Sequence, residues 1–369
     1  MINKKLLIVY PYLPNYRMPF FILLRDKLKI YNIDLIICSG SNIGKKKVME
    51  PEIPEDLRVY KQKRVGISLF DFQVQWQKEL IETITKEKPD FAVYMYNAGI
   101  LNYSISMLYL KIKNIPYYVW TSGHKRFGLS KGKHKIKDFF KFYFVNSASG
   151  IISYSNYFKS KLIESGYPAQ KVTVAQNTVA LPTKNFIINK DYQIIKFLFV
   201  GNIIEDKKLD ILIYSIKKLS NSYTNLKCDI VGDGYYLETL KNKVSKLNLE
   251  EYIIFHGAKF GKEVSDFFIN SNIFVLPGTG GLAINEALFY GLPIISTPGD
   301  GTGFDLVIEG KNGFLLDFNP SVDQLSKVME YFLKCKKEEI RKMESFSVEI
   351  SKSITLENMV ESFIKPFIN

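Results

Sequence analysis

The fold is decided by the stretch Asn272-Ile-Phe-Val-Leu276 and its continuation Pro277-Gly-Thr-Gly-Gly-Leu-Ala-Ile-Asn-Glu286-Ala-Leu-Phe-Tyr-Gly-Leu-Pro-Ile-Ile295. An apolar run typical of a buried strand leads into a Gly-rich turn, then a helical pattern opening near Leu282, then a second short apolar strand. Glycines at the mouth of a helix let backbone N–H groups approach an anion, which the helix dipole favours. Glu286 lies one turn inside this helix, where its carboxylate can reach a ribose. The stretch therefore predicts a nucleotide site.

The same alternation of short apolar runs and amphipathic segments continues on both sides of this stretch. Strands are predicted in the first half at residues 6–10, 34–38, 91–95, 117–120, 151–153 and 172–175, with helices such as 72–86 and 100–113 between them. In the second half strands are predicted at 197–200, 227–231, 252–255, 273–276, 293–296 and 313–316, and helices at 207–219, 236–246, 262–270, 282–290 and 322–333. This alternation is typical of parallel sheets covered by helices on both faces.

Two doubly wound α/β domains in tandem follow from this pattern. We expect an N-terminal domain over residues 1–180, a linker over 181–195, where the pattern breaks, and a second domain over 196–350. An amphipathic segment over 351–369 predicts a last helix that packs back on the N-terminal domain. Ligands of such sheets bind beyond the carboxyl ends of the strands, here expected to face a cleft between the domains.

Composition excludes several classes of protein. The chain has 369 residues, 46% of them hydrophobic and 24% charged, which is typical of a soluble globular protein of two domains. No apolar run is long enough to span a bilayer, and residues 1–10 resemble a first strand rather than a signal peptide. The three cysteines are far apart and have no metal or redox spacing, which fits a reducing cytoplasm.

The net charge of +13 admits three kinds of partner, namely nucleic acid, an anionic membrane or phosphate-rich ligands. No nucleic-acid-binding motif is present, so no nucleic acid partner is expected. Basic residues gather among aromatic ones between residues 111 and 141, which suggests contact with an anionic membrane surface. A solvated loop and helix face, in a chain rich in lysine throughout, explains this stretch equally well.

The chain resembles the retaining GT-B glycosyltransferases of family four over nearly all of its length. The resemblance is carried in order by Phe199-Val-Gly201-Asn-Ile-Ile-Glu-Asp-Lys207-Lys-Leu-Asp210, Ile230-Val-Gly-Asp-Gly234, Phe255-His-Gly257, residues 277–293 and Asp305-Leu-Val-Ile-Glu-Gly-Lys-Asn-Gly-Phe314. In the first half it is carried by Ile152-Ser-Tyr-Ser-Asn-Tyr-Phe158, Val174-Ala-Gln-Asn177 and Pro14-Asn-Tyr-Arg17-Met-Pro-Phe-Phe21, the last typical of members that build bacterial surface polysaccharides. The resemblance implies the GT-B fold, two Rossmann-like domains facing a central cleft.

Three positions depart from the family pattern. The family has two glutamates eight positions apart; Glu286 resembles the second, and Gly278 stands at the place of the first. Asn202 stands where many members have an arginine beside the phosphates, which leaves Lys207 as the principal cation. The usual Asn-Gly-Val-Asp element is Asn177-Thr-Val-Ala180 in this chain.

The resemblance assigns roles residue by residue. The predicted donor-binding residues are Gly201, Asn202, Lys207, Gly232, Gly257, Thr279, Gly280, Gly281, Leu282 and Glu286; Asn15, Arg17 and Asp305 are expected on the acceptor or sugar side; and His124 and Lys207 are the catalytic candidates. Lys207 would stabilise the departing diphosphate, and His124 would contact the transferred sugar. Each role has a structural alternative: an exposed helix lysine for Lys207, a loop histidine for His124, a surface arginine for Arg17, and helix N-terminal acids for Glu286 and Asp305.

These assignments predict a cytoplasmic glycosyltransferase that moves a sugar, with retention, from a nucleotide sugar to a lipid-linked surface glycan such as lipopolysaccharide or capsule. It would be peripheral on the inner face of the cell membrane where the basic stretch contacts lipid. No Asp-x-Asp motif or His/Cys cluster is present, so neither a metal nor a cofactor is expected. Two alternatives stay open: a nucleotide-sugar epimerase on a related fold, and a non-catalytic subunit that binds nucleotide sugar.

Overall fold

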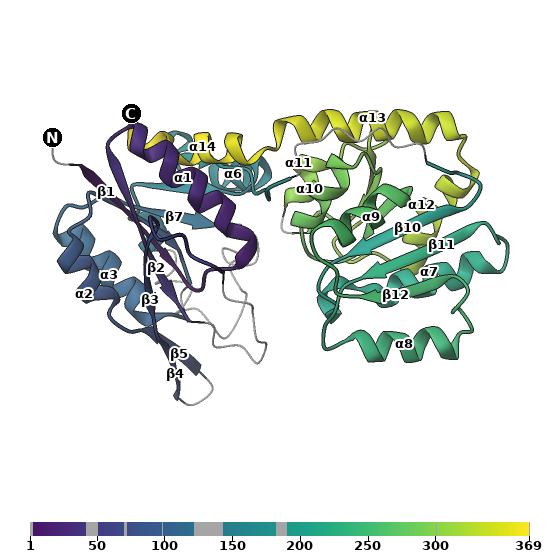
Figure 1. The fold of residues 1–369 in the computed structure, drawn as a ribbon, viewed down its shortest axis with the longest axis horizontal. Coiled ribbons are helices and arrows are strands. Elements are labelled where there is room, and N and C mark those ends of the chain that lie inside the picture. The colour runs from purple at the N-terminus through teal and green to yellow at the C-terminus, as the bar shows by residue number, and fades with distance from the viewer. Residues whose placement is uncertain are drawn as a thin grey trace. The chain divides into compact units, whose positions relative to one another are not determined.

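The structure, a computed structural model, describes residues 3–41, 51–69, 72–97, 99–121, 143–181, 190–299 and 301–368. The chain divides into two compact units (Figure 1). Unit 1 comprises Met1–Ala180 and Leu356–Asn369, and unit 2 comprises Leu181–Thr355. The chain therefore passes between the units twice, once after Ala180 and once after Thr355.

Unit 1 is built on a seven-stranded sheet in the order β3-β2-β1-β6-β7-β8-β9, and every pair in it is parallel. Its strands are β1 (Lys4–Tyr10), β2 (Ile33–Gly40), β3 (Arg58–Gln62), β6 (Phe91–Met95), β7 (Tyr117–Thr121), β8 (Gly150–Ser153) and β9 (Val172–Val174). A separate antiparallel hairpin, β4 (Arg64–Leu69) and β5 (Phe72–Gln77), follows β3 directly. The order reverses between β1 and β6, which is the switch point typical of a doubly wound sheet.

Two hydrophobic clusters cover the faces of this sheet, because successive side chains of a strand point to opposite faces. Leu6 and Ile8 of β1 join one cluster, and Leu7 and Val9 join the other. The first cluster contains α1 (Met18–Ile30) and α14 (Leu356–Ile368), and the second contains α2 (Leu80–Glu87), α3 (Leu101–Ile112) and α6 (Asn156–Glu164). The near-continuous apolar strands that the sequence shows are thus buried on both sides.

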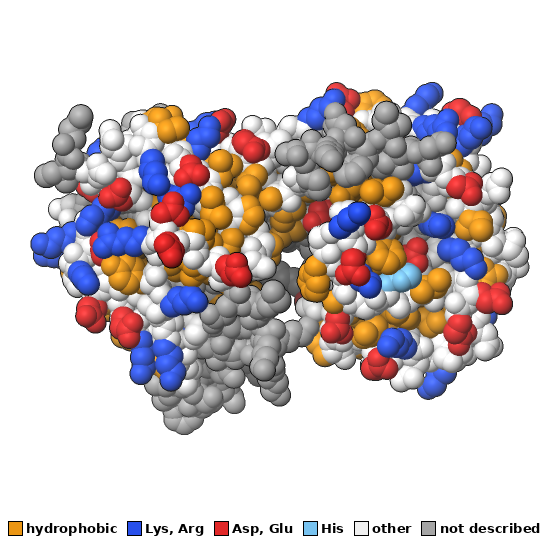
Figure 2. All heavy atoms as spheres, in the orientation of Figure 1, with side chains coloured by type: hydrophobic (Ala, Val, Ile, Leu, Met, Phe, Trp, Pro, Cys, Tyr) orange, Lys and Arg blue, Asp and Glu red, His pale blue; other side chains and the backbone are white. Residues whose placement is uncertain are grey.

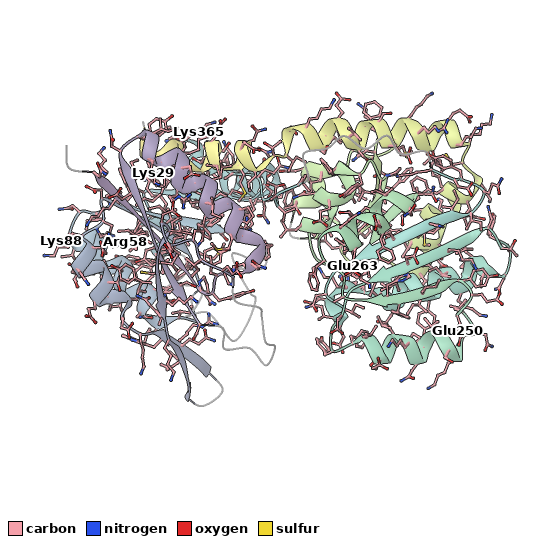
Figure 3. The ribbon with its side chains drawn as sticks, in the orientation of Figure 1. Lys29, Arg58, Lys88, Glu250, Glu263 and Lys365 are labelled. Atoms are coloured by element: carbon pink, nitrogen blue, oxygen red, sulfur yellow. The ribbon has the colours of Figure 1, made fainter. Side chains whose placement is uncertain are left out.

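The last helix, α14, packs against the first, α1, although they lie at opposite ends of the chain. Phe363 of α14 contacts Phe20 of α1 edge to face with ring centroids 5.3 Å apart, and Lys27 pairs with Glu361 at 3.2 Å. Lys29 and Lys365, labelled in Figure 3, mark the two helices. The end of the chain is therefore part of the core of unit 1.

Unit 2 is built on a six-stranded parallel sheet in the order β12-β11-β10-β13-β14-β15. Its strands are β10 (Ile195–Val200), β11 (Leu226–Val231), β12 (Ile253–Gly257), β13 (Ile273–Leu276), β14 (Ile294–Ser296) and β15 (Gly313–Leu315). Its helices are α7 (Leu209–Ser220), α8 (Leu237–Lys246), α9 (Lys262–Asn270), α10 (Leu282–Phe289), α11 (Thr302–Leu306), α12 (Val322–Lys334) and α13 (Lys337–Ser353), with a 3₁₀ turn η3 (Glu205–Lys207) after β10. Here the order reverses between β10 and β13.

The α/β class and all twelve predicted strands are confirmed, with boundaries that agree or differ by one or two residues. The helix predicted over 72–86 is wrong in its first half. The segment Phe72-Gln-Val-Gln-Trp-Gln77 forms β5, and only Leu80–Glu87 is helical. The segment Phe72–Gln77 alternates strictly between apolar and polar residues, and this period of two predicts a strand rather than a helix. The structure also adds β3, β4, α11 and α13, which the sequence pattern did not predict.

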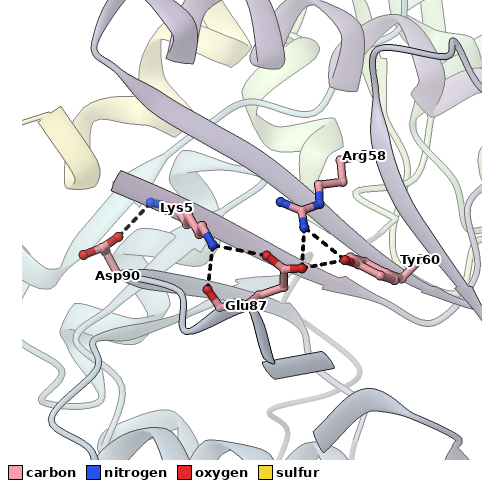
Figure 4. Close-up of polar contacts among 5 residues, drawn as sticks. All are labelled: Lys5, Arg58, Tyr60, Glu87 and Asp90. Carbon is pink, nitrogen blue, oxygen red and sulfur yellow. Dashed lines mark hydrogen bonds and ion pairs between the residues drawn. The ribbon is translucent and has the colours of Figure 1, made fainter. Parts of the chain in front are cut away.

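One buried carboxylate holds the edge strand β3 in place (Figure 4). The side chain of Glu87, at the end of α2, is 2% exposed and accepts hydrogen bonds from Arg58 and Tyr60 of β3 at 2.5 Å each and from Lys5 of β1 at 3.3 Å. Burial alone would raise the pKa of Glu87, but the hydrogen bonds from Tyr60 and Lys5 and the charge of Arg58 outweigh it and lower the pKa. One side chain therefore ties α2 to two strands.

Replacing Glu87 with glutamine should lower the free energy of unfolding at pH 7 by about 1–3 kcal/mol, because charge-assisted hydrogen bonds are lost. A carboxyl group whose folded-state pKa is lowered contributes stability above its unfolded value of 4.5 and loses it as the pH falls through the folded-state value. Urea unfolding should therefore show a difference at pH 7 that shrinks on acidification. Glu82→Gln, an exposed glutamate of the same helix, is the matched control. Equal stability of wild type and Glu87→Gln at pH 7 would contradict the proposed role.

Charged side chains of both signs are interspersed on the visible face of each unit (Figure 2). Among the residues that the structure describes, no helix is both long and apolar enough to cross a membrane. The basic, aromatic stretch proposed for lipid contact falls mostly within residues 122–142, outside the described residues. The membrane contact stays a prediction.

Candidate functional site

Three of the predicted donor-binding glycines lie together at the carboxyl edge of the unit 2 sheet. Gly201 follows β10, Gly232 follows β11, and Gly257 ends β12. The Gly201 N–H donates to Val231, and the Gly232 N–H donates to Gly257 at 2.8 Å. A Cβ on Gly232, whose φ is 145°, would lie 1.8 Å from the Gly201 carbonyl oxygen. Only glycine permits this approach, so the edge presents bare backbone where a ligand can come close.

The turn after β13 packs backbone to backbone against η3, the turn after β10. The Thr279 N–H donates to the Asp206 carbonyl oxygen at 2.9 Å. A Cβ on Gly278 would lie 2.2 Å from that same oxygen and 2.5 Å from the Cα of Lys207. The contact between these turns therefore requires glycine at position 278, where the resembled family has its first glutamate. The two turns follow β10 and β13, the strands on either side of the switch point, where doubly wound sheets bind ligands.

Lys207 is brought directly to this turn. Its Nζ donates a hydrogen bond to the Thr279 carbonyl oxygen, and the side chain is half-buried. A Cβ on Gly280 would lie 2.4 Å from that Nζ, so the glycine makes room for the ammonium group. The structure thus joins three predicted donor-binding residues, Lys207, Thr279 and Gly280, in one contact. Asn202, by contrast, is exposed.

The helix α10 begins at Leu282, with Gly281 as its N-cap and no side chain capping its first turn. Glu286 lies one turn inside this helix and is half-buried. Burial raises the pKa of its carboxyl group, which makes no hydrogen bond or ion pair with any residue of the described part of the chain. A desolvated acceptor with no protein partner is a group suited to a ligand's hydroxyls.

A third turn, after β14, also contacts the turn after β13, and sequence reasoning missed it. The Thr297 hydroxyl donates to the Gly278 carbonyl oxygen at 2.7 Å. A Cβ on Gly299, whose φ is 61°, would lie 2.9 Å from the Gly280 carbonyl oxygen. The segment Thr297-Pro-Gly299 directly follows the strand predicted at 293–296. That position places it at the carboxyl edge of the unit 2 sheet, which is the signal in the sequence that could have identified it. Asp305 lies beyond it on the short helix α11 and is partly exposed.

The predicted site residues of unit 1 lie apart from this constellation in the chain. Asn15 is exposed at the start of η1 (Asn15–Arg17). Arg17 is 1% exposed, against the expectation of a residue open to ligands. Its Nη2 donates to the Asn177 side-chain oxygen at 2.7 Å, and its guanidinium lies over four aromatic rings, those of Tyr16, Phe20, Trp120 and Tyr154. His124 lies outside the described residues.

The described residues hold no group of three or more His, Cys, Asp or Glu side chains arranged to bind a metal ion. His256, the one histidine described, has its Nε2 2.6 Å from Oδ1 of Asp229 and its ring 4.5 Å from that of Phe267. It is thus engaged by its neighbours in the sheet and on α9. Among the residues that the structure describes, the polar groups at the carboxyl edge include backbone amides, the Lys207 ammonium and the Glu286 carboxylate.

The chain is similar in sequence and in fold to known glycosyltransferases. Residues 182–347 match the family model of the glycosyl transferases group 1. An uncharacterized glycosyltransferase of Methanocaldococcus jannaschii is 31% identical over 252 residues, which cover 67% of this chain and 66% of the relative. Among solved structures, a lipopolysaccharide outer core galactosyltransferase has a TM-score of 0.71 at 15% identity, covering 97% of this chain and 98% of that one. HepE of Anabaena, solved in complex with UDP, has a TM-score of 0.72 at 15% identity over 98% and 99%.

Replacing Glu286 with glutamine should weaken binding of the nucleotide donor about tenfold or more, because hydrogen bonds to a charged acceptor are worth about 1.5–3 kcal/mol. The same change should stabilise the ligand-free protein at pH 7. The folded-state pKa of Glu286 is raised above its unfolded value of 4.5, so the protein loses stability as the pH rises from the unfolded-state pKa through the folded-state pKa. Glutamine does not ionise, so the variant avoids this loss. Calorimetry and thermal unfolding measure both effects. Glu250→Gln, an exposed residue of the same unit labelled in Figure 3, should change neither. Unchanged donor affinity in an intact Glu286→Gln fold would remove Glu286 from the site.

Adding a methyl group at Gly278 should disrupt the contact between the two turns. Because the new Cβ would meet backbone atoms at 2.2 and 2.5 Å, Gly278→Ala should lower the free energy of unfolding by about 1–3 kcal/mol and weaken nucleotide binding. Chemical denaturation and calorimetry provide the measurements. Gly66→Ala is the matched control, since a Cβ there would meet no atom within 4 Å. A Gly278→Ala variant with wild-type stability and affinity would show that the turns need not touch.

Proposed function

We propose that this chain, a relative of the glycosyl transferases group 1 with the GT-B fold, transfers a sugar from a nucleoside diphosphate donor to a growing surface glycan. The observation that carries the proposal is that a cation and a desolvated carboxylate both lie at the unit 2 switch point. Lys207 contacts the turn that opens α10, and Glu286 lies one turn inside that helix without a described protein partner. Two solved structures of the same fold, one a galactosyltransferase of lipopolysaccharide and one bound to UDP, support this class of reaction.

Each group has a distinct task in the proposed reaction. The first-turn amides of α10 and the Lys207 ammonium meet the diphosphate, and the Glu286 carboxylate accepts hydrogen bonds from the ribose hydroxyls. As the bond from the anomeric carbon to the diphosphate oxygen breaks, negative charge grows on the leaving group. A cation that stabilises this charge more than it stabilises the ground state lowers the barrier. In the donor complex, Lys207 exchanges its bond to the Thr279 carbonyl for the diphosphate.

We further propose that the reaction retains configuration and needs no metal ion. The acceptor hydroxyl attacks on the face that the diphosphate leaves, and its proton passes to an oxygen of the departing phosphate. One bond from the anomeric carbon to oxygen breaks and one forms, so no protein nucleophile is consumed. His124 would contact the transferred sugar, and the acceptor would be lipid-linked and presented at the inner face of the membrane.

A second candidate, a subunit that binds nucleotide sugar without turning it over, is favoured by one observation. Gly278 stands at the position of a glutamate typical of the resembled family, and the backbone around it leaves no space for any side chain. Slow hydrolysis of a bound donor by the purified chain would distinguish an enzyme from this subunit, because a binding protein leaves the donor intact.

The test begins with binding of UDP-, GDP-, ADP- and dTDP-sugars measured by native mass spectrometry. The donor that binds is then used to measure transfer or hydrolysis by wild type and by Lys207→Ala. Turnover should fall at least tenfold in the variant and by more than the affinity for the free nucleoside diphosphate, because the charge acts mainly on the leaving group.

Lys208→Ala is the matched control, since it removes the same charge one residue further on. The Lys208 side chain bonds to the Phe318 carbonyl oxygen at 2.8 Å and to Asn319 at 2.7 Å, away from the Thr279 turn. It should keep wild-type turnover. Failure of all four donor classes to bind the wild type would refute the proposed function, and equal turnover by wild type and Lys207→Ala would remove Lys207 from the mechanism.

A further inference from the structure

The carboxyl edge of the unit 1 sheet brings three separate loops together. Because β1, β2 and β3 are parallel and in register, with Tyr10 beside Ser39 and Gly40 beside Gln62, the residues that follow them meet at one edge. The Ser41 N–H donates to the Gln62 carbonyl oxygen at 2.9 Å, and a Cβ on Gly40 would lie 2.5 Å from the Pro11 carbonyl oxygen. In a doubly wound sheet this edge is where ligands bind.

Arg64 emerges at this edge, at the base of the hairpin that follows β3. Its backbone N–H donates to the Ser41 hydroxyl at 2.9 Å, which fixes its position. Its guanidinium makes no hydrogen bond or ion pair with any residue of the described part of the chain. The residue as a whole is half-buried, and its Nε is fully buried. Burial lowers the pKa of Arg64, and the groups that oppose this shift are the tyrosines Tyr103 and Tyr12, not a carboxylate.

Other arginines of unit 1 have the partners that Arg64 lacks. Arg58 pairs with Glu87, and Arg25 pairs with Asp26 and Asp56. The buried Arg17 donates a hydrogen bond to Asn177 through Nη2, although its Nε, like that of Arg64, has no partner among the described residues. Desolvating a guanidinium without an anion costs free energy that a structural role would recover through a partner. The missing partner of Arg64 is therefore a candidate ligand group.

Two exposed tyrosines of the first loop complete the surface. Tyr12 is 37% exposed and Tyr16 is 49% exposed. Burial, and after it the neighbouring Tyr16, raises the pKa of Tyr12, while the charge of Arg64 opposes this shift. The Tyr16 ring lies over the buried Arg17 guanidinium at 5.2 Å from its centroid, so its inner side is supported by a fixed cation. Exposed rings beside a few placed polar groups are typical of a small-ligand site.

We propose that Arg64, Tyr12 and Tyr16 form an acceptor subsite that recognises an anionic group, a carboxylate or a phosphate, on the acceptor glycan. The guanidinium fork matches both oxyanions in a bidentate fashion, and the tyrosine rings pack against the sugar that carries the charge. The proposal rests on the proposed glycosyl transfer, because it names the acceptor of that reaction. It assigns the recognition of charge to Arg64 rather than to Arg17, whose guanidinium is enclosed.

The test compares three probes that differ only in charge: a glucuronate-containing disaccharide, the same disaccharide with a phosphate in place of the carboxylate, and the uncharged disaccharide. Binding to the full chain is measured by calorimetry. Wild type should bind at least one charged probe about tenfold or more tightly than the uncharged one, and Arg64→Gln should remove that preference. The charged probe that binds more tightly identifies the source of the anion as an acidic sugar or a phosphate.

Lys63→Gln is the matched control, because Lys63 is an exposed neighbour with the same charge and should keep the preference. Tyr16→Ala should weaken the binding of all three probes to the same extent, since an aromatic ring does not distinguish a charged sugar from an uncharged one. If Arg64→Gln does not fold, Arg64→Lys keeps the charge without the fork and should reduce the preference by less than an order of magnitude. Equal binding of charged and uncharged probes by wild type, or equal losses in Arg64→Gln and Lys63→Gln, would overturn the proposal.

Nucleotide-sugar binding is measured on the same preparations. Because Arg64 is not among the residues proposed to bind the donor, Arg64→Gln should bind the donor as tightly as wild type. A wild type that binds the donor but does not distinguish the disaccharides refutes the acceptor subsite alone. A wild type that binds no donor refutes the proposed function instead.

Discussion

The contact of two backbone turns across the unit 2 switch point is the constraint on which the candidate site depends. Gly278 places the turn after β13 against the carbonyl of Asp206 and the Cα of Lys207, at distances that no side chain would allow. This contact fixes where α10 begins and where the Lys207 ammonium lies. The start of α10 and the Lys207 ammonium are therefore positioned by the absence of a Cβ at one residue.

The departure from the pattern of the resembled family at Gly278, which favours the binding subunit as a second candidate, also fits a transferase, because the contact between the turns requires glycine there. A carboxylate at position 278 would place negative charge next to Lys207 and would compete with a diphosphate for it. With glycine there, Glu286 is the carboxylate that remains on this helix and turn, and burial holds its pKa above the ordinary value. The site keeps a desolvated acceptor that destabilises the empty protein, which is the arrangement expected where ligand binding recovers the cost.

The sequence predicted the strands well because parallel strands buried on both faces are short, continuous apolar runs. It failed where the relevant information is not local. The burial of Arg17 depends on Trp120, Tyr154 and Asn177, which come from three later segments of the chain. No pattern around Arg17 shows that these side chains converge. The turn at Thr297 was missed for a different reason: it carries no motif, and only the shared edge of parallel strands connects it to the site.

Arg17 and Arg64 of unit 1 differ in burial and in partners, and this difference separates an arginine with a structural role from a candidate for ligand binding. Arg17 is enclosed by four aromatic rings and donates a hydrogen bond to Asn177, which lies three residues before the end of the first segment of unit 1. Its Nη1 also lies 3.8 Å from the sulfur of Met359 in α14, the segment in which the chain comes back to unit 1. The Arg17 guanidinium therefore stabilises the fold of unit 1. Arg64 is less buried, yet its guanidinium makes no hydrogen bond or ion pair with any of the residues that the structure describes. Since desolvation without a partner is tolerated mainly where a ligand supplies one, the less buried arginine is the better candidate for recognition.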